Sequence, residues 1–347
     1  MSPFTELTLT AQTAYAQLLE AAVSAEHMRS VADLTGSFAA KTVRGQKYWY
    51  FQYTEPAGNL RQVYVGPDND AVRALIENKS RASPATSLGP LARSAQALGC
   101  AEILPRHMRV IQRLADYGFF RAGGVLVGTH AFLACGNMLG VRWGDAARTQ
   151  DLDFAHAGKK LSIALPSNFE LNTDAAIRSL EMGLLPVSGL TTGAGATCLS
   201  PKEPEFRLDF LTPLHRGGEE PFDHPRLGVV LQPLRFLEFP LEKVQLAVLF
   251  SGGRTVLVSI PDPARYAVHK LLVYGLRAGA QAAKSNKDLA QAGALLTLLK
   301  QTRDWEAREA WADLIGRGRG WVERAKRGLT ALDNAFPDLD ARNWLQG

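Results

Sequence analysis

The chain has 347 residues, of which 46% are hydrophobic and 21% charged, and its formal net charge is +5. This balance excludes a largely disordered chain, a collagen-like repeat and a disulfide-stapled miniprotein. No run of about 18–20 apolar residues predicts a membrane helix, and the first residues lack a signal-peptide pattern, so we expect a cytoplasmic protein without membrane contact. The cysteines lack metal-site spacing and are predicted to be reduced thiols near the core: Cys100, Cys135 and Cys198.

The first 90 residues predict a helix followed by a small three-stranded meander. Apolar residues at helical spacing favour a helix over 3–33, which Gly36 ends. Period-two patterning with aromatic and β-branched residues then predicts three strands, at 38–44, 47–53 and 61–65. A short helix is predicted at 70–78. Residues 79–90, rich in Ser, Ala and Pro, are predicted to form a linker.

The rest of the chain mixes helix-like and strand-like patterns. Helical segments are predicted at 91–119, 130–139, 174–182, 263–278 and 288–301. Strands are predicted at 123–129, 152–154, 161–165, 206–211, 228–231, 244–250 and 255–260. We therefore predict an α+β protein with three regions. A mixed-sheet domain over 91–260 follows the N-terminal helix and β-meander of 1–90 and precedes a mainly helical part over 261–347.

A glycine turn stands between a predicted strand and a predicted helix. Gly128-Thr129 ends the apolar strand, Gly128 allows close backbone approach, and Thr129 is predicted to be the helix N-cap. The free N–H groups of such a helix start form a natural phosphate site. The alternative interpretation, and the commoner one for a lone Gly-Thr pair, is a turn with no function.

A pair of carboxylates lies on one predicted strand. Alternation places Asp151 and Asp153 on one face, with Leu152 and Phe154 on the other. A buried pair of this kind is costly unless a cation lies between the carboxylates, and Mg²⁺ prefers hard oxygen ligands that it shares with phosphates. The alternative is a solvated strand edge with two surface acids.

A third carboxylate, Asp209, interrupts a later apolar strand pattern. An isolated charge there is expensive, so either a base such as Arg207 neutralises Asp209 or it belongs to a metal site. Three carboxylates on neighbouring strands would complete a two-metal site for phosphoryl or nucleotidyl transfer.

The ordered set Gly128-Thr129, Asp151-x-Asp153 and Asp209 resembles the nucleotidyltransferase fold of the DNA polymerase β superfamily. Over residues 95–300, the amino-acid sequence around these residues is similar to a bacterial nucleotidyltransferase-like family that is related to AbiEii-type toxin nucleotidyltransferases. The resemblance implies two Mg²⁺ ions, with Mn²⁺ as an alternative, held by all three aspartates. It also implies that Gly128 and Thr129 cradle a nucleoside triphosphate.

The same resemblance assigns basic residues to the nucleotide. Lys270 would reach the triphosphate, with Arg277 and Lys287 as further candidates. The alternative is that these bases are solvated and that Asp288 caps a helix. The chain departs from the family in carrying Thr129 where Ser is usual and in a longer stretch before the acid pair, which predicts an added loop near the site at 140–148.

Two basic, aromatic-containing stretches leave alternatives open. Residues 316–328 hold five basic residues and Trp321, which fits either RNA contact or a solvated helix face. The meander combines Lys and Arg with Tyr and Trp, which fits contact with nucleic acid or protein, or packing against the flanking helix.

These patterns and the resemblance together predict a Mg²⁺-dependent nucleotidyltransferase. It would move a nucleoside monophosphate from an NTP to an acceptor hydroxyl, such as an RNA or tRNA end, and release pyrophosphate. The alternative hypothesis is a non-catalytic nucleotide-sensing or nucleic-acid-binding module of a toxin–antitoxin or phage-defence system, acting with a partner protein. A third hypothesis makes the N-terminal meander a DNA-binding element.

Overall fold

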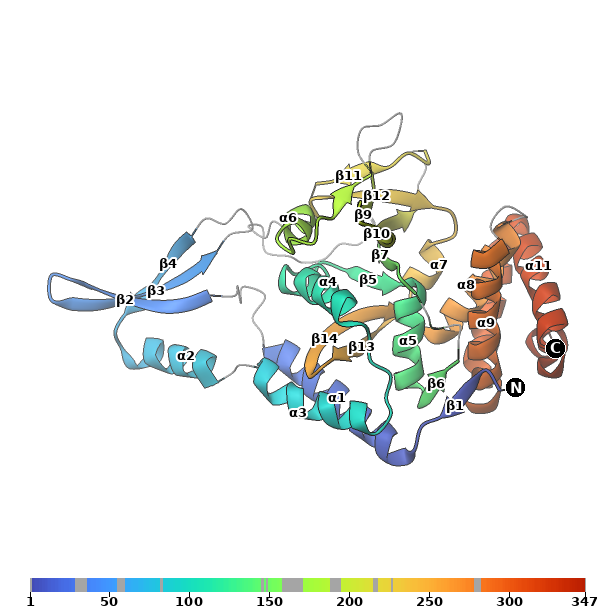
Figure 1. Cartoon of the computed structure of the whole chain (residues 1–347), viewed down its shortest axis with the longest axis horizontal. Helices are drawn as coiled ribbons and strands as arrows, with labels where there is room; N and C mark the ends of the chain where they lie inside the picture. The colour runs from blue at the N-terminus through green and yellow to red at the C-terminus, as the bar shows by residue number, and fades with distance from the viewer. Residues whose placement is uncertain are drawn as a thin grey trace.

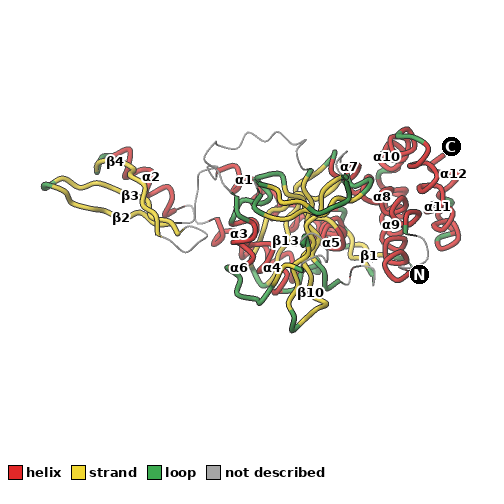
Figure 2. Tube along the Cα trace, turned by 90° about the horizontal axis from the view of Figure 1, so that it is seen from above, coloured by secondary structure: helices red, strands yellow, loops and turns green. Residues whose placement is uncertain are grey.

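The computed structural model describes residues 2–28, 36–54, 60–81, 84–144, 147, 149–157, 171–187, 195–214, 218–225, 227–277 and 282–346. Helices and a mixed sheet make up the protein, which confirms the predicted α+β class. Figures 1 and 2 show the N-terminal meander on one side of the central sheet and the C-terminal helices on the other. The predicted strand at 161–165 lies outside the described residues.

The central sheet carries the predicted acidic strands side by side. Its main path runs β11-β12-β10-β7-β5. These strands are β5 (Gly124–Val127), β7 (Leu152–His156), β10 (Glu203–Pro213), β11 (Phe222–His224) and β12 (Val229–Leu234). β7 and β12 run parallel to β10, and β5 runs antiparallel to β7. Two further strands extend the sheet: β9 (Thr197–Ser200) pairs with β10, and β8 (Leu185–Pro186) pairs with β9.

Strand alternation explains which side chains enter the core. Leu152 and Phe154 of β7 lie opposite Leu208 and Phe210 of β10, and all four are fully buried. The Phe154 and Phe210 rings stack with centroids 5.4 Å apart. Burying each ring contributes roughly 2–3 kcal/mol, so these four residues fix the register of the two strands. The residues between them therefore emerge on the other face of the sheet.

Helices and a hairpin cover the central sheet (Figure 1). They are α4 (Pro105–Asp116), α5 (Gly128–Met138), α6 (Thr173–Arg178), and the antiparallel pair β13 (Val244–Ser251) and β14 (Arg254–Pro261). The cysteines are free and buried, as predicted. No helix in the described part of the chain is long and apolar enough to cross a bilayer.

The N-terminal segment is anchored in the body of the protein. The predicted helix over 3–33 is wrong at its start, where β1 (Phe4–Glu6) pairs with β6 (Val141–Trp143). The helix itself is α1 (Leu9–Met28), which packs on α3 (Pro84–Ala97) and on β13. The Tyr15 hydroxyl donates to the Val248 carbonyl at 3.1 Å and accepts from the Val248 N–H at 3.2 Å.

The predicted linker at 79–90 is also wrong. The helix α2 (Asp70–Arg81) extends into this stretch, and α3 begins at Pro84. A proline is favoured in the first turn of a helix, where its missing N–H has no partner to lose. The Ser, Ala and Pro content therefore marked a helix start rather than a flexible connection.

The three predicted strands of the meander are confirmed as β2 (Gly36–Val43), β3 (Gln46–Thr54) and β4 (Leu60–Pro67). With α2 they form a unit that stands apart from the central sheet (Figure 2). The domain boundaries expected after residues 90 and 260 stay predictions.

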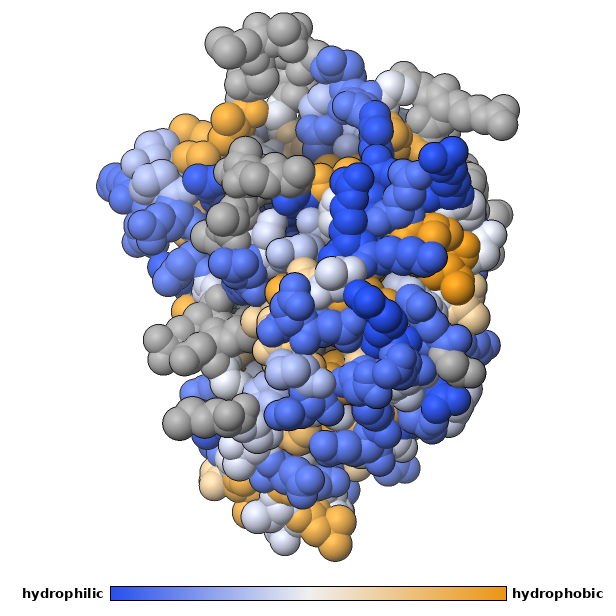
Figure 3. Space-filling view, turned by 90° about the vertical axis from the view of Figure 1, so that its right-hand side faces the viewer, coloured by the Kyte–Doolittle hydropathy of each residue, from blue (hydrophilic) through white to orange (hydrophobic). Residues whose placement is uncertain are grey.

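The C-terminal part is helical, as predicted. Its elements are α8 (Pro263–Leu276), α9 (Ala282–Thr302), α10 (Asp304–Gly316), α11 (Arg319–Ala335), a 3-10 turn (Pro337–Leu339) and α12 (Ala341–Gln346). Figure 3 shows that this side of the molecule is largely hydrophilic, with apolar residues in small separate patches.

Several members of the basic stretch at 316–328 make contacts within the protein. Trp321 packs edge-on against Phe236, with ring centroids 4.6 Å apart. The Arg324 guanidinium lies over the same Phe236 ring, and Arg319 pairs with Glu323 one helical turn away. These contacts support the solvated-face alternative over RNA contact for this stretch.

Candidate active site

Asp153 and Asp209 lie directly opposite each other. They are register partners in the parallel ladder of β7 and β10, where neighbouring strands are about 4.8 Å apart. Both side chains are half-buried on the face opposite the apolar core. Asp151, also half-buried, immediately precedes β7. The fold therefore brings together the three acids that the sequence pattern singled out.

The pKa values of Asp151 and Asp153 are both raised. Burial and the neighbouring Asp209 raise the pKa of Asp153 to about 6, and Asp151 adds to this shift. Burial is also the main cause of the raised pKa of Asp151, with Asp209 contributing. Among the described residues, the Asp151 and Asp153 carboxylates have no hydrogen-bonded or ion-paired side chain. Negative charge here is thus incompletely compensated by the protein itself.

The third acid has a hydrogen-bonding partner on the adjacent strand. The Thr197 hydroxyl donates to Asp209 Oδ1 at 2.5 Å from the register-paired position of β9. Arg207, the base considered from the sequence, instead donates from Nε to the Pro204 carbonyl at 3.0 Å. The neutralising Arg207–Asp209 pair is therefore not formed.

Gly128 lies directly against Asp153. Val127 is the register partner of Asp153 across β5 and β7, so Gly128 follows at the end of β5 beside the carboxylate. Its φ is +63°, and a Cβ at this position would lie 1.9 Å from Asp153 Oδ2. Both the backbone conformation and the close approach therefore require glycine.

Helix α5 begins at this glycine, and no cap by a side chain of the described residues is found at its first N–H groups. The residue preceding it, Val127, makes no side-chain capping bond. The prediction of Thr129 as N-cap is wrong, because the helix starts one residue earlier and Thr129 lies inside its first turn. The uncapped N–H groups face an anion more favourably than a capped end would.

Hydrogen bonds from two C-terminal helices hold the Gly128-Thr129 turn in place. The Tyr266 hydroxyl on α8 lies 2.9 Å from the Gly128 carbonyl oxygen and 3.0 Å from Gln291 Oε1 on α9. Gln291 Nε2 donates to Thr129 Oγ1 at 3.3 Å. The sequence analysis missed Tyr266 and Gln291. Their only signal was polar atoms on helix faces that are otherwise apolar, a weak signal from sequence alone.

The predicted basic residues lie on these same two helices. Lys270 Nζ is 2.5 Å from Asp288 Oδ1, and Arg277 pairs with Asp288 Oδ2. The expectation that Asp288 caps a helix is wrong, because α9 starts six residues earlier, at Ala282. Asp288 instead fixes two cations in place.

Three lysine charges act on the carboxylates. Lys270 and Lys284 partly offset the rise that burial causes in the pKa of Asp153, and Lys284 and Lys287 partly offset that of Asp151. Burial, with the neighbouring Lys270, lowers the pKa of the half-buried Lys287. Lys284 was not among the predicted nucleotide-binding residues. Its charge nevertheless reaches both acids from an exposed position on α9.

The first part of the added loop predicted near the site at 140–148 is a strand instead. Val141–Trp143 is strand β6, which follows α5 and pairs with β1. Gly128 and Met138 stand at opposite ends of α5, so β6 is separated from the turn by about 15 Å of helix. Of the remaining stretch, residues 145, 146 and 148 lie outside the described residues.

The donor set suits a cation that takes part of its ligands from elsewhere. In the described part of the chain, no three His, Cys, Asp or Glu side chains form a closed group that could hold a metal ion. Two carboxylates in register next to a third nevertheless offer hard oxygen donors, and the pKa values of Asp151 and Asp153 are raised. Mg²⁺ commonly binds through one or two carboxylates and completes its shell with water and substrate phosphates, so the residues present fit it.

Comparison with known proteins identifies the family of this chain. A family model described as nucleotidyltransferase matches residues 106–316, whereas no curated protein matches the chain. The crystal structure of an antigenic nucleotidyltransferase-like protein from Paracoccidioides brasiliensis is similar at 15% sequence identity, with 65% of this chain and 95% of that chain covered and a TM-score of 0.29. The matched family segment spans more than half of the chain and includes Gly128, the three aspartates and Lys270. The chain therefore belongs to the nucleotidyltransferase family.

Proposed function

We propose that this protein transfers a nucleoside monophosphate from an NTP to an acceptor hydroxyl in a Mg²⁺-dependent reaction. The observation that carries the proposal is the register pairing of Asp153 with Asp209 directly beside Gly128 and the free start of α5. A metal–triphosphate complex would need hard oxygen donors for the cation and N–H donors for the phosphates, and this arrangement offers both.

Asp151, Asp153 and Asp209 would hold the metal, as two Mg²⁺ ions or with Mn²⁺ in their place. When bound, the metal supplies charge neutralisation between the carboxylates and the phosphates and lowers the pKa of the acceptor hydroxyl. The raised pKa values of Asp151 and Asp153 support this role, since a nearby cation would reverse the unfavourable interaction between the acids.

The chain's other residues would orient the triphosphate. The N–H groups of Gly128 and Thr129 would donate to phosphate oxygens. Lys270 and Arg277, held by Asp288, and Lys287 would compensate the phosphate charge. The acceptor oxygen would attack the α-phosphorus, the bond to the β-phosphate oxygen would break, and pyrophosphate would leave. Asp209 would accept the proton of the acceptor hydroxyl.

The acceptor that we propose is RNA, with the end of a tRNA as one form of it. The mildly basic composition is compatible with a polyanionic acceptor, and the resemblance to AbiEii-type toxin enzymes points in the same direction. A role in a toxin–antitoxin or defence system with a partner protein is the wider proposal that this resemblance suggests.

Label transfer tests the proposed reaction. The full-length protein is incubated with Mg²⁺, total cellular RNA and each α-labelled NTP in turn, beside an Asp151→Asn/Asp153→Asn variant. We expect label on RNA that is lost in the variant and when the metal is chelated. Label on a protein band would overturn the RNA acceptor. Bound NTP without any transfer would overturn the proposed reaction in favour of a nucleotide-sensing module.

A further inference from the structure

One face of the meander sheet is covered by helix α2. Trp49 of β3 is the register partner of Gly66 of β4, and a Cβ on Gly66 would lie 3.1 Å from Val72 Cγ2 of α2. The Trp49 indole N–H donates to Asp68 Oδ1 at 2.9 Å, on this same face. Alternation along the strands adds Phe51, with Phe38 beside it across β2.

The opposite face carries tyrosines that no described element covers. Tyr48 and Tyr50 alternate with Trp49, and Tyr64 is the register partner of Tyr50. The Tyr64 ring lies 5.6 Å from that of Tyr50 and 6.2 Å from that of Tyr48, measured between centroids. The Tyr64 residue is 54% exposed. The three rings thus form a continuous aromatic surface across β3 and β4.

Lys41 places a positive charge on the open face. Lys41 is the register partner of Tyr48, and its Nζ lies 4.9 Å from the Tyr50 ring centroid and 2.5 Å from Gln62 Oε1. By alternation, Gln46, Gln52 and Gln62 lie on this face as well. Lys41 and the glutamines surround the rings with hydrogen-bond donors and acceptors.

The acid next to the meander strands is neutralised on the side of α2. The strands β2, β3 and β4 contain Lys41, Lys47 and Arg61 but no Asp or Glu. The acid that follows them, Asp68, is bound on the α2 side by Trp49 and by Arg73 at 3.0 Å. Hydrogen bonds from Arg73 and Trp49 also hold the pKa of Asp68 well below its usual range. Lys47 belongs to this same side, since its Nζ lies over the Trp49 ring and 4.0 Å from Asp68 Oδ2. The open face therefore combines the tyrosines with Lys41, and the described strands place no carboxylate on it.

We propose that the open face of the meander binds single-stranded RNA, the acceptor of the proposed transfer reaction. Unpaired bases stack on aromatic rings whatever their sequence, and a nearby cation compensates the backbone phosphates. The glutamine amides offer partners for the 2′-hydroxyl, which favours RNA over DNA. A base-paired duplex cannot present its ring faces to the sheet.

This inference rests on the proposed function for the identity of its ligand, but it assigns a separate surface. The meander stands apart from the central sheet (Figure 1), so it would bind nucleotides away from the reacting end. The sheet would hold an unpaired stretch of the RNA, while the carboxylates would carry out the transfer at its end.

Fluorescence anisotropy with the full-length protein tests the surface without NTP or Mg²⁺. The probe is a labelled single-stranded RNA of about 12 nucleotides, a length within the site sizes of such platforms. We expect Tyr64→Ala to weaken binding roughly five- to hundredfold, and Tyr64→Phe, which keeps the ring, to change it by less than about twofold. Lys41→Gln should weaken binding and reduce its dependence on salt concentration.

Trp305→Ala is the matched control, because Trp305 is 60% exposed but lies on α10. Equal RNA affinity of wild type, Tyr64→Ala and Lys41→Gln would overturn the proposal. Equal or tighter binding of DNA of the same sequence, or of duplex RNA, would overturn the assignment to single-stranded RNA. Asp153→Asn separates the two proposals, since it should bind RNA normally. RNA binding that depends on Tyr64, without label transfer by wild type, would overturn only the proposed reaction.

Discussion

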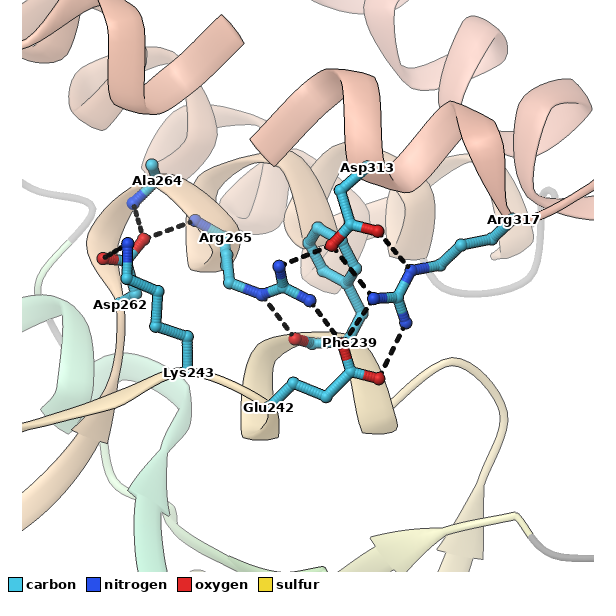
Figure 4. Close-up of polar contacts among 8 residues, drawn as sticks. All are labelled: Phe239, Glu242, Lys243, Asp262, Ala264, Arg265, Asp313 and Arg317. Carbon is cyan, nitrogen blue, oxygen red and sulfur yellow. Dashed lines mark hydrogen bonds and ion pairs between the residues drawn. The ribbon is translucent and has the colours of Figure 1, made fainter. Parts of the chain in front are cut away.

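Two clusters of charged residues near α8 differ in how their carboxylates are neutralised. Near the start of α8, Arg265 and Arg317 lie between Glu242 and Asp313, and every charge faces an opposite one (Figure 4). At the candidate active site, Asp153 and Asp209 lie side by side as like charges. The first cluster is neutralised within the protein, whereas the like charges of the second are only partly offset by nearby lysines.

The pKa values of the carboxylates differ in the same way between the two clusters. Hydrogen bonds from Arg317, and then from Arg265, lower the pKa of Asp313, and those from Glu242 and Asp313 raise the pKa of Arg317. Burial and like charge raise the pKa of Asp153. The arginine cluster therefore stabilises the fold where α7 (Glu238–Leu241), α8 and α10 meet. The raised pKa of Asp153 shows that its ionised form is disfavoured in the folded protein, as is common for carboxylates at functional sites.

The largest expected effect is on catalysis, from Asp209→Asn. Removing one carboxylate of the pair weakens metal binding and the proton acceptor together, so we expect the rate of label transfer to fall by roughly 10²–10³ or more. The melting temperature should stay the same or rise, because the repulsion of Asp153 is relieved. Transfer assays and thermal unfolding of the same preparation measure both effects.

Asp313→Asn is the matched change in the arginine cluster. It should lower the melting temperature and leave the transfer rate per folded molecule unchanged, because Asp313 contacts Arg265 and Arg317 and no part of the candidate site. Loss of transfer in Asp313→Asn, or a large destabilisation by Asp209→Asn, would contradict the division between a stabilising and a functional cluster.

The second prediction concerns pH, through Asp153. Its pKa of about 6 in the folded protein lies above the ordinary value of 3.8, so the unfolded state ionises first as pH rises. In metal-free protein, the contribution of Asp153 to the free energy of unfolding therefore falls between about pH 4 and pH 6 and is level above. Two pKa units correspond to about 3 kcal/mol at most.

Mg²⁺ should act in the opposite direction, because it binds the ionised carboxylate. Stabilisation by Mg²⁺, measured as the rise in melting temperature, should increase as pH rises through 6. Asp153→Asn should remove both the fall in the free energy of unfolding of the metal-free protein and the rise with pH in the stabilisation by Mg²⁺. A Mg²⁺ effect that is the same at pH 5 and pH 8 would count against a metal site at Asp153.

The third prediction is the stability cost of Arg265→Met. The variant keeps the apolar stem over the Phe239 ring but loses hydrogen bonds to the Phe239 carbonyl, Glu242 and Asp313, of 2.8, 2.7 and 2.6 Å. Since the Arg265 side chain is only 12% exposed, we expect a loss of about 2–3 kcal/mol in the free energy of unfolding, measured by urea denaturation.

Arg319→Met provides the reference for that measurement. Arg319 is 92% exposed and pairs only with Glu323 on its own helix among the described residues, so the variant should stay within about 0.5 kcal/mol of wild type. Equal effects of the two substitutions would show that the arginine cluster contributes no more than a surface ion pair.

The candidate site was predictable from sequence where local rules suffice. Alternation places Asp151 and Asp153 away from the buried Leu152 and Phe154, and an acid within the apolar pattern of β10 marks Asp209. The register that sets Asp153 opposite Asp209 joins strands more than 40 residues apart, and no local pattern specifies it. It follows from the packing of Phe154 on Phe210.

The errors come from elements whose ends depend on tertiary contacts. Thr129 resembles an N-cap, but Gly128 at positive φ starts α5 itself because Asp153 leaves no room for a side chain. Asp288 resembles an N-cap, but α9 extends further toward the N-terminus and turns Asp288 toward Lys270 and Arg277. β1 and β6 are too short to show a pattern and form by pairing with each other.

The smallest effect is expected from Tyr266→Phe, which tests how the C-terminal helices support the site. The hydroxyl is the contact between α8 and the Gly128 carbonyl, and burial raises its pKa well above the usual value, so it acts as a neutral hydrogen-bonding group. Its loss removes the hydrogen bonding between α8 and the Gly128 turn, at a cost of about 1–2 kcal/mol in the free energy of unfolding.

Because Tyr266 holds the turn rather than the substrate, its removal should raise KM for the NTP severalfold and leave kcat nearly unchanged. Tyr274→Phe on the same helix is the control, since no hydrogen bond joins Tyr274 to another described residue. It should change neither KM nor the melting temperature. A fall in kcat as large as that of Asp209→Asn would instead place Tyr266 in contact with the reacting groups. The C-terminal helices would then belong to the catalytic machinery and not only to its support.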